Sequence, residues 1–266
     1  MKVVLFCGGL GTRLREYSEV LPKPMVNIGY RPILWHVMKY YAHFGHKEFI
    51  LCLGYKGDAI KHYFLNYDEC VSNNFVLRNG GKDIKLLNSD IDDWNITFVD
   101  TGINSNIGQR LAAVRDYIGE DEEFMANYSD GLSDLPMPKY IDHFEKRGNI
   151  ASFVSVVPTQ SFHVLKLDGE RVCEISHIRQ SGMRINGGFF LFKRQIFDYI
   201  REGEELVEQP FQRLIAANQL YAYNYDGFWA CMDTFKDKQM LDDMYAKDDA
   251  PWEVWKPVRK RKVGVA

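Results

Sequence analysis

The chain has 266 residues, of which 46% are apolar and 26% are charged, and its formal net charge is −3. This composition is typical of a soluble globular protein and favours neither a nucleic-acid nor a membrane partner. No apolar run approaches the length of a transmembrane helix, and the apolar run after Met1 leads us to expect no signal peptide. Five cysteines without a Cys-x-x-Cys pair disfavour a disulfide framework and a zinc site, so we expect a cytoplasmic protein.

The first predicted strand, Val3–Phe6, opens directly into a glycine-rich loop. Glycines let backbone N–H groups approach a phosphate closely, and Arg13 and Lys23 add two positive charges. The loop has neither the Lys-Ser/Thr pair of a P-loop nor the third glycine of a Rossmann fingerprint. We predict that it binds a nucleoside triphosphate; the alternative is a tight strand-to-helix turn without a ligand. The residues expected at the nucleotide are Gly8, Gly9, Gly11, Thr12, Arg13 and Lys23.

The first 157 residues alternate between strand and helix patterns. Strands are predicted at Val3–Phe6, Glu48–Leu53, Ile96–Asp100, Phe124–Asn127 and Ile150–Val157, and helices at Pro32–Phe44, Asp58–Tyr67, Ile107–Tyr117 and Met137–Arg147. This alternation predicts a mostly parallel sheet with helices on both faces, whose ligands bind at the carboxyl ends of the strands. The stretch from Val71 to Trp94 is rich in Asn, Asp and Gly and is predicted to be a long loop or hairpin, acting as a lid or an oligomer contact.

After residue 158 the pattern becomes richer in strands. A hairpin is predicted from His163–Leu167 and Arg171–Ile175 around the turn Asp168-Gly169. The elements expected after it are a strand at Ile185–Phe192, helices at Arg194–Ile200 and Phe211–Ala217, strands at Tyr221–Tyr225 and Phe228–Cys231, and a helix from Thr234 to Ala246. Residues 256–266 form a basic tail, for which a solvated, frayed terminus is favoured over a contact with an acidic partner.

A series of motifs extends in order over residues 1–255. They are Gly8-Gly-Leu-Gly-Thr-Arg-Leu14, Pro22-Lys-Pro-Met25, Pro32-Ile-Leu-Trp-His36, Gly54-Tyr-Lys-Gly57, Val99-Asp-Thr-Gly102, Gly108-Gln-Arg-Leu111, Ser129-Asp-Gly131, Ile185-Asn-Gly-Gly-Phe189, Gly227-Phe-Trp229 and Met232-Asp-Thr234. This series resembles sugar-1-phosphate nucleotidyltransferases, in particular the glucose-1-phosphate cytidylyltransferase branch. The resemblance implies a Rossmann-like, mostly parallel α/β sheet flanked by helices, with a smaller β-rich acceptor-binding part. We expect one domain at 1–255, with a nucleotide-binding part at 1–157 and an acceptor-binding part at 158–255.

The resemblance also implies an activity: Mg²⁺-dependent joining of CTP and a sugar 1-phosphate, glucose 1-phosphate by family, to give a CDP-sugar and pyrophosphate. It further implies a homo-oligomer and a role in polysaccharide biosynthesis. The residues carried over for catalysis are Arg13, Lys23, Asp130 and Asp233, of which Asp130 and Asp233 also hold Mg²⁺. Those carried over for the nucleotide are Gly108, Arg110, Ser129 and Asp130. Two of the residues carried over have alternatives, because Asp233 would otherwise cap the helix that follows and Arg110 would otherwise lie on a helix surface.

The acceptor side departs from the family pattern. The family's Glu-Lys-Pro, whose lysine holds the sugar phosphate, has no counterpart in segment 175–182, where Arg179 or His177 could replace the lysine. His163 stands where the family has a glycine beside the sugar. The residues expected at the acceptor are Arg179, Asn186, Gly187 and His163. A different phosphorylated or phosphonate acceptor, and a catalytically silent nucleotide-binding paralogue, are the alternatives to the family reaction.

Overall fold

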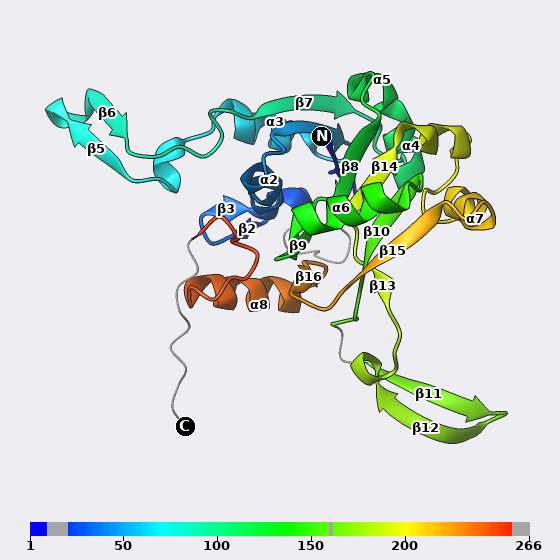
Figure 1. Cartoon of the computed structure of the whole chain (residues 1–266). Coiled ribbons are helices and arrows are strands. Elements are labelled where there is room, and N and C mark those ends of the chain that lie inside the picture. Colours follow the sequence, from blue (N-terminus) through cyan, green and yellow to red (C-terminus); the bar gives the residue numbers. More distant parts are fainter. Residues whose placement is uncertain (10–20, 160–161, 257–266) are drawn as a thin grey trace, which may run out of the picture.

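The computed structural model describes residues 1–9, 21–159 and 162–256. Within these residues a central sheet has helices on both of its faces (Figure 1). Four parallel strands run in the order β7-β4-β1-β8, and β14 then pairs antiparallel with β8, followed by β10 and β15. The predicted α/β sheet is therefore confirmed, with β14 as an antiparallel insertion. The strands are β1 (Val3–Phe6), β4 (Glu48–Leu53), β7 (Asn95–Asp100), β8 (Glu123–Tyr128), β10 (Ala151–Val156), β14 (Phe190–Lys193) and β15 (Leu220–Tyr225).

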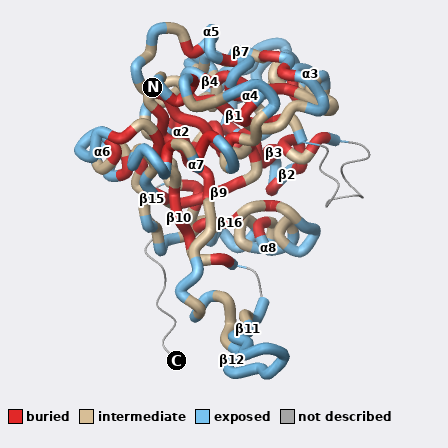
Figure 2. Tube along the Cα trace, turned by 90° about the vertical axis from the view of Figure 1, so that its right-hand side faces the viewer, coloured by how far each residue is buried: buried red, intermediate tan, exposed pale blue. Residues whose placement is uncertain are grey.

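Side chains of the sheet alternate between two hydrophobic cores. Val3 and Leu5 of β1 pack with residues of α2, α6 and α8, whereas Val4 and Phe6 pack with residues of α4, α5 and α7. Figure 2 shows buried residues concentrated in the strands and on the inner sides of the helices. The helices are α2 (Ile33–His43), α3 (Gly57–Leu65), α4 (Ile107–Ala113), α5 (Arg115–Ile118), α6 (Met137–Arg147), α7 (Gln209–Ala216) and α8 (Phe235–Ala246).

Short elements make up much of the rest of the described chain. They are η2 (Lys23–Met25), β2 (Asn27–Ile28), β3 (Arg31–Pro32), η3 (Glu69–Val71), η4 (Asn79–Gly81), β9 (Gly131–Ser133), η5 (Ile178–Gln180), β13 (Ile185–Asn186), η6 (Arg194–Tyr199) and β16 (Trp229–Cys231). Two predicted helices differ from the structure. The helix expected at Ile107–Tyr117 breaks at Val114 into α4 and α5, and the one expected at Arg194–Ile200 is the 3₁₀ helix η6.

The strand expected at Ile185–Phe192 is interrupted, because Asn127 of β8 reaches into it. The Asn127 side-chain oxygen accepts hydrogen bonds from the backbone N–H groups of Phe189 and Tyr128, both at 2.9 Å. Gly188 has φ +76°, and a Cβ built on it would lie 2.4 Å from that oxygen, so a side chain there would displace Asn127. The two halves, β13 and β14, both pair with β10 on the edge opposite β15.

Residues 158–255 contribute strands to the central sheet, and the division of the chain into a nucleotide-binding and an acceptor-binding part stays a prediction. Strands β13, β14 and β15 belong to the central sheet, and β16 pairs with β9. Trp252 is buried and packs on Phe228, so the chain returns to the body before residue 256. No helix in the described part of the chain is long and apolar enough to cross a membrane.

Two hairpins project from the body (Figure 1). One is formed by β5 (Phe75–Arg78) and β6 (Asp83–Leu86), which confirms the hairpin alternative for the stretch from Val71 to Trp94. The other is formed by β11 (His163–Asp168) and β12 (Arg171–His177), as the turn Asp168-Gly169 predicted. An isolated two-stranded hairpin is marginally stable in water, so both hairpins need stabilising contacts in addition to their own strand pairing.

Candidate active site

A cavity of about 260 Å³ lies at the carboxyl ends of β1 and β8. This is the sheet edge at which ligands of open α/β folds bind. Its walls come from the loop after β1, from η2, from the start of α4, from the end of β8 and from the segment before α8. The residues that line it are Phe6, Cys7, Gly8, Gly9, Lys23, Pro24, Ile107, Tyr128, Ser129, Asp130 and Asp233.

Lys23 lies between the two predicted aspartates. Its ammonium contacts Asp130 and lies 2.6 Å from Oδ1 of Asp233. Pairing of β9 with β16 brings these carboxylates together, because the Met232 N–H donates to the Asp130 carbonyl oxygen at 3.0 Å. Burial works to lower the pKa of Lys23, but the charges and hydrogen bonds of Asp130 and Asp233 outweigh it, and the pKa is raised. Lys23 therefore forms one charged cluster with Asp130 and Asp233, which lie 107 and 210 positions later in the chain.

The two carboxylates suit a magnesium ion. Both already direct an oxygen at one cationic centre, the Lys23 nitrogen, and Mg²⁺ prefers one or two carboxylates together with phosphate oxygens and water. The described residues contain no group of three or more His, Cys, Asp or Glu side chains that could enclose a metal. A site on Asp130 and Asp233 would therefore need substrate oxygens or water to complete it.

Asp233 is not the cap of the helix that follows, so that alternative is wrong. Thr234 is the N-cap of α8, and its side chain accepts a hydrogen bond from the Asp237 N–H. The Asp237 carboxylate in turn accepts from the Thr234 N–H at 2.8 Å, which completes a capping box. The Asp233 side chain is left to contact Lys23, and the Cys231 thiol donates to it at 3.5 Å.

Arg110 is buried behind the glycine loop, which excludes the helix-surface alternative. It is 1% exposed, and its guanidinium donates to the Leu53 carbonyl oxygen and to the Thr101 hydroxyl at 3.1 and 2.7 Å. A Cβ built on Gly8 would lie 2.1 Å from Nη1 of Arg110, so the guanidinium lies directly against this backbone. Arg110 makes no ion pair with any residue that the structure describes, and its Nε has no hydrogen-bond partner. A direct contact with nucleotide remains a prediction.

The other predicted nucleotide residues differ in whether they line the cavity. Gly9 lines the cavity, and a Cβ on it would meet no atom of the described residues within 4 Å. Ser129 also lines the cavity, but its hydroxyl donates to the Phe6 carbonyl oxygen at 2.9 Å and ties β8 to β1. Gly108 lies outside the cavity lining, and a Cβ on it would lie 2.2 Å from the Glu204 carbonyl oxygen. Gly11, Thr12 and Arg13 lie outside the described residues.

The predicted acceptor residues are not brought together. Asn186 contacts the cavity residue Tyr128 through its Nδ2, and Gly187 accepts a hydrogen bond from Nε1 of Trp229 at 2.8 Å. His163 instead stands on the exposed hairpin, with its ring 5.5 Å from that of His177, its register partner. Arg179 follows on η5, is exposed, and does not line the cavity.

Sequence reasoning missed five residues of the cavity wall. They are Phe6, Cys7, Pro24, Ile107 and Tyr128. Burial, followed by the nearby charges of Glu205 and Asp130, raises the pKa of Tyr128 to about 12. A usable signal existed for Tyr128, since it directly follows the predicted strand Phe124–Asn127 and precedes Ser129 and Asp130 at the ligand-binding edge.

Comparisons with known proteins identify the family of this chain. A family model described as nucleotidyl transferase matches residues 2–237. Glucose-1-phosphate cytidylyltransferases from Salmonella typhi and Salmonella typhimurium are each 39% identical over 257 residues, covering 96% of this chain and all of theirs. A solved structure of UDP-glucose pyrophosphorylase in complex with UDP-glucose aligns with TM-score 0.67 at 14% identity, over 93% of this chain and 98% of that one, and supports the fold.

Proposed function

Because this chain belongs to the nucleotidyl transferase family, we propose that it joins CTP and a sugar 1-phosphate into a CDP-sugar with release of pyrophosphate. Full-length similarity to glucose-1-phosphate cytidylyltransferases supports both the nucleotide and glucose 1-phosphate as the first acceptor to test. The observation that carries the proposal is the cluster of Lys23, Asp130 and Asp233 in a cavity whose floor is the loop at Gly8 and Gly9.

The reaction needs charge neutralisation rather than a protein nucleophile. An oxygen of the acceptor phosphate, already an anion, forms a bond to the α-phosphorus of CTP, and the bond from that phosphorus to the bridging oxygen breaks. Negative charge moves onto the departing pyrophosphate. Lys23 supplies positive charge beside the phosphates, and Gly8 and Gly9 line the cavity that would hold them. Correct positioning of the two anions supplies the rest of the rate enhancement.

Asp130 and Asp233 would hold the Mg²⁺ of this reaction. Bound there, the ion would neutralise phosphate charge and orient phosphate oxygens. Both carboxylates already contact a cation, the Lys23 ammonium, at the position where the ion would add its charge.

The test is pyrophosphate release in the presence of Mg²⁺, with the four nucleoside triphosphates crossed against glucose 1-phosphate and other sugar 1-phosphates. We expect turnover with CTP and a CDP-sugar as product. Asp130→Asn should abolish turnover while the folding transition stays nearly unchanged. Asp142→Asn is a matched control, because Asp142 is also a carboxylate paired with a lysine, at 2.7 Å, but lies exposed on α6. Release of pyrophosphate with CTP from no sugar 1-phosphate would refute the proposal.

A different phosphorylated acceptor is the second candidate. It is supported by the position of Arg179, the proposed replacement for the family's lysine, which is exposed on η5 rather than at the cavity. Turnover with CTP only from another phosphorylated or phosphonate acceptor would favour this candidate. CTP binding without pyrophosphate release from any acceptor would favour a silent paralogue.

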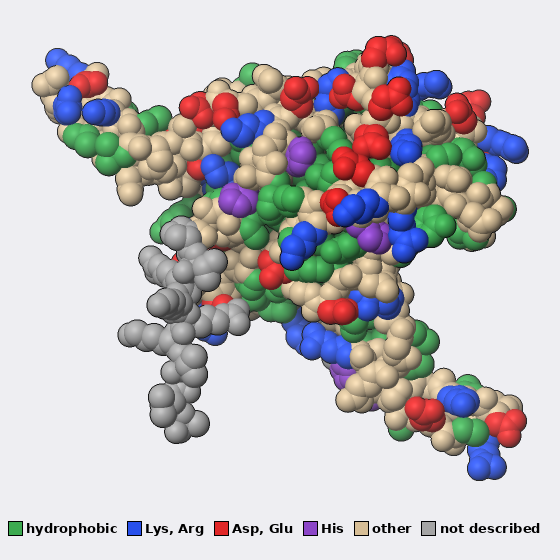
Figure 3. All heavy atoms as spheres, viewed as in Figure 1, with side chains coloured by type: hydrophobic (Ala, Val, Ile, Leu, Met, Phe, Trp, Pro, Cys, Tyr) green, Lys and Arg blue, Asp and Glu red, His purple; other side chains and the backbone are tan. Residues whose placement is uncertain are grey.

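We also propose that copies of the chain associate through the β5–β6 hairpin. The register pairs Phe75 with Leu86 and Leu77 with Ile84, so one face of the hairpin is entirely apolar, and all four side chains are exposed. Figure 3 shows apolar side chains along one side of the projecting arm. Exposed apolar patches of this kind commonly mark interaction surfaces.

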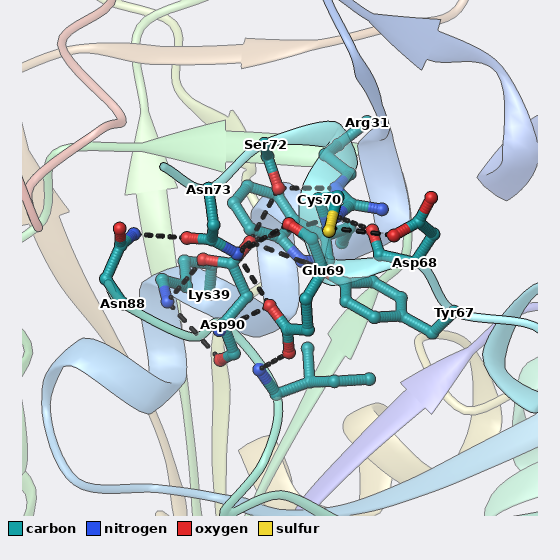
Figure 4. Close-up of polar contacts among 12 residues, drawn as sticks. Arg31, Lys39, Tyr67, Asp68, Glu69, Cys70, Ser72, Asn73, Asn88 and Asp90 are labelled. Carbon is teal, nitrogen blue, oxygen red and sulfur yellow. Dashed lines mark hydrogen bonds and ion pairs between the residues drawn. The ribbon is translucent and has the colours of Figure 1, made fainter. Parts of the chain in front are cut away.

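The root of this hairpin is fixed to the body by a polar cluster around Asp90 (Figure 4). Lys39 of α2 and Ser72 both donate to the Asp90 carboxylate, at 3.0 and 2.6 Å. Burial works to raise the pKa of Asp90, but these hydrogen bonds outweigh it and hold the pKa below its usual value. The adjacent Arg31 donates to Ser72 and lies over the Tyr67 ring at 4.1 Å. A fixed root suits an arm that presents its face to a partner.

Light scattering tests the association. Leu77→Glu should lower the molar mass to that of a smaller species, whereas Lys85→Glu, on the opposite face of the same hairpin, should not. An unchanged molar mass for Leu77→Glu would refute the contact.

The chain's five thiols are all free, which supports a reducing compartment such as the cytoplasm.

A further inference from the structure

Tyr128 lines the cavity and carries a hydroxyl group that the reaction described above does not use. The residue ends β8 and directly precedes Ser129 and Asp130. Its ring is packed edge-on against Phe190 at 5.5 Å and lies 6.4 Å from the ring of Phe6. Its backbone N–H is bound by the Asn127 side chain at 2.9 Å. The ring is therefore held by strand pairing, side-chain packing and a hydrogen bond to its own backbone.

The hydrogen bonds around Tyr128 determine what its hydroxyl can offer a ligand. The Asn186 side-chain oxygen accepts from the Gly188 N–H at 2.9 Å, so the amide nitrogen of Asn186 faces Tyr128 and donates to its oxygen at 3.4 Å. The Tyr128 oxygen is thus an acceptor in this pair, and its own proton is not used in it. No described residue accepts that proton. A tyrosine hydroxyl is protonated at neutral pH, so it can donate one hydrogen bond to a bound molecule.

The order of strands indicates which substrate this donor faces. The glycine loop follows β1, the Asp130 carboxylate follows β8, and Asn186 stands on β13, which pairs with β10 on the same edge as β14, the neighbour of β8. In-line transfer requires the attacking and leaving oxygens to lie on opposite sides of the α-phosphorus. If the leaving phosphates lie at Gly8, Gly9 and Lys23, the acceptor approaches from the side of β13. That side is where Tyr128 and Asn186 meet.

We propose that Tyr128 is a specificity-determining residue whose hydroxyl donates a hydrogen bond to a sugar hydroxyl of the acceptor. Asn186 is a positioning residue in this arrangement, because it directs the lone pair and proton of Tyr128. The inference rests on the proposed function, since it assumes a sugar 1-phosphate acceptor. A site built to bind a substrate hydroxyl rejects analogues that lack it more strongly than an apolar pocket can.

The test compares Tyr128→Phe with the unaltered enzyme, using the sugar 1-phosphate that it turns over and the single-deoxy analogues of that sugar. We expect kcat/KM for the acceptor to fall about tenfold in Tyr128→Phe, as for loss of one hydrogen bond, with the KM for CTP changed less than about twofold. The unaltered enzyme should discriminate about tenfold against one deoxy analogue, and Tyr128→Phe should not discriminate against it. Loss of discrimination at one position only is a result that general damage to the fold would not produce.

Tyr63→Phe is the matched control. The Tyr63 hydroxyl also accepts one long hydrogen bond, from Arg31 at 3.3 Å, but it lies near the root of the β5–β6 hairpin and outside the cavity. Its removal should leave both KM values unchanged. A rise in the KM for CTP in Tyr128→Phe, or equal losses with every deoxy analogue, would overturn the assignment.

Binding measured by calorimetry separates this inference from the proposed function. If glucose 1-phosphate and the other sugar 1-phosphates neither bind nor react with the unaltered enzyme, the proposed acceptor class fails and the inference fails with it. If a sugar 1-phosphate binds the unaltered enzyme and Tyr128→Phe with equal affinity, only the role of Tyr128 is overturned. Weaker binding to Tyr128→Phe, with unchanged binding to Tyr63→Phe, supports it.

Discussion

Replacement of Gly8 by alanine tests how the glycine loop and Arg110 are packed together. The added Cβ would lie 2.1 Å from Nη1 and 2.2 Å from Cζ of Arg110, far inside van der Waals contact. Gly8 is not among the residues with positive φ, so alanine adds no backbone strain and the effect is one of side-chain packing. The guanidinium ends a flexible side chain, but it is 1% exposed and cannot move into solvent without disturbing the core.

The size of the effect follows from what the guanidinium must give up. It donates to the Leu53 carbonyl oxygen, the Thr101 hydroxyl and the Ile103 carbonyl oxygen, at 3.1, 2.7 and 3.3 Å. Loss of one or two such bonds from a buried charged donor costs about 2–4 kcal/mol. We expect Gly8→Ala to lower the free energy of unfolding by that amount. Gly9→Ala should change it by less than about 0.5 kcal/mol, because a Cβ there meets no atom of the described residues within 4 Å.

Urea unfolding followed by circular dichroism gives the free energies, and a double-mutant cycle isolates the contact. Arg110→Ala is itself expected to be destabilising, but it removes the group that the new Cβ would strike. Gly8→Ala should therefore cost little when it is made in the Arg110→Ala background. Equal costs of Gly8→Ala in the two backgrounds, or stability of Gly8→Ala equal to that of the unaltered chain, would refute the reasoning.

Three further predictions concern stability. Thr234→Ala should lower the free energy of unfolding by about 1 kcal/mol, because the N-cap of α8 is lost. Asp233→Ala should abolish turnover with little loss of stability. A larger loss of stability in Asp233→Ala than in Thr234→Ala would show that Asp233 is the cap. Trp229→Phe should cost about 1–2 kcal/mol in urea unfolding, because the Gly187 carbonyl oxygen loses a 2.8 Å donor; an unchanged midpoint would contradict this. Burial lowers the pKa of His36 to about 4, so below about pH 6.5 the unfolded chain binds a proton that the folded one does not, and stability should fall by about 2 kcal/mol from pH 6.5 to 5. His36→Gln should reduce this slope without abolishing it, because burial and then the N-terminal ammonium also lower the pKa of His46 to about 4. An equally steep slope in His36→Gln would assign it to other groups.

The sheet and its order of elements could largely be predicted because they depend on local patterns. The apolar run at Val3–Phe6 and the helical period at Met137–Arg147 both match the structure residue for residue. The break at Val114 could not be predicted, since no glycine or proline marks it. The interruption between β13 and β14 depends on Asn127, 62 residues away from Phe189, and a contact of that range has no local signature.

The cap of α8 is a different case, because its signal was present in the sequence. Thr234 and Asp237 have the spacing of a capping box, with aspartate in place of the usual glutamate or glutamine. That spacing assigns the cap to Thr234 and leaves Asp233 for Lys23. The pairing of Asp130 with Asp233 itself depends on β9 and β16, so only the family resemblance could anticipate it.

The two glycines of the loop show why a motif alone cannot separate binding from folding. Both Gly8 and Gly9 line the cavity, and both fit a loop that admits phosphate. Gly8 has a second reason to lack a side chain, because the guanidinium of Arg110 fills the space beside it. No atom of the described residues lies within 4 Å of a Cβ built on Gly9, so the described part of the chain gives it no such reason. A loss of CTP binding in Gly9→Ala, at unchanged stability, would therefore report on the approach of phosphate to the backbone, whereas the same loss in Gly8→Ala would not.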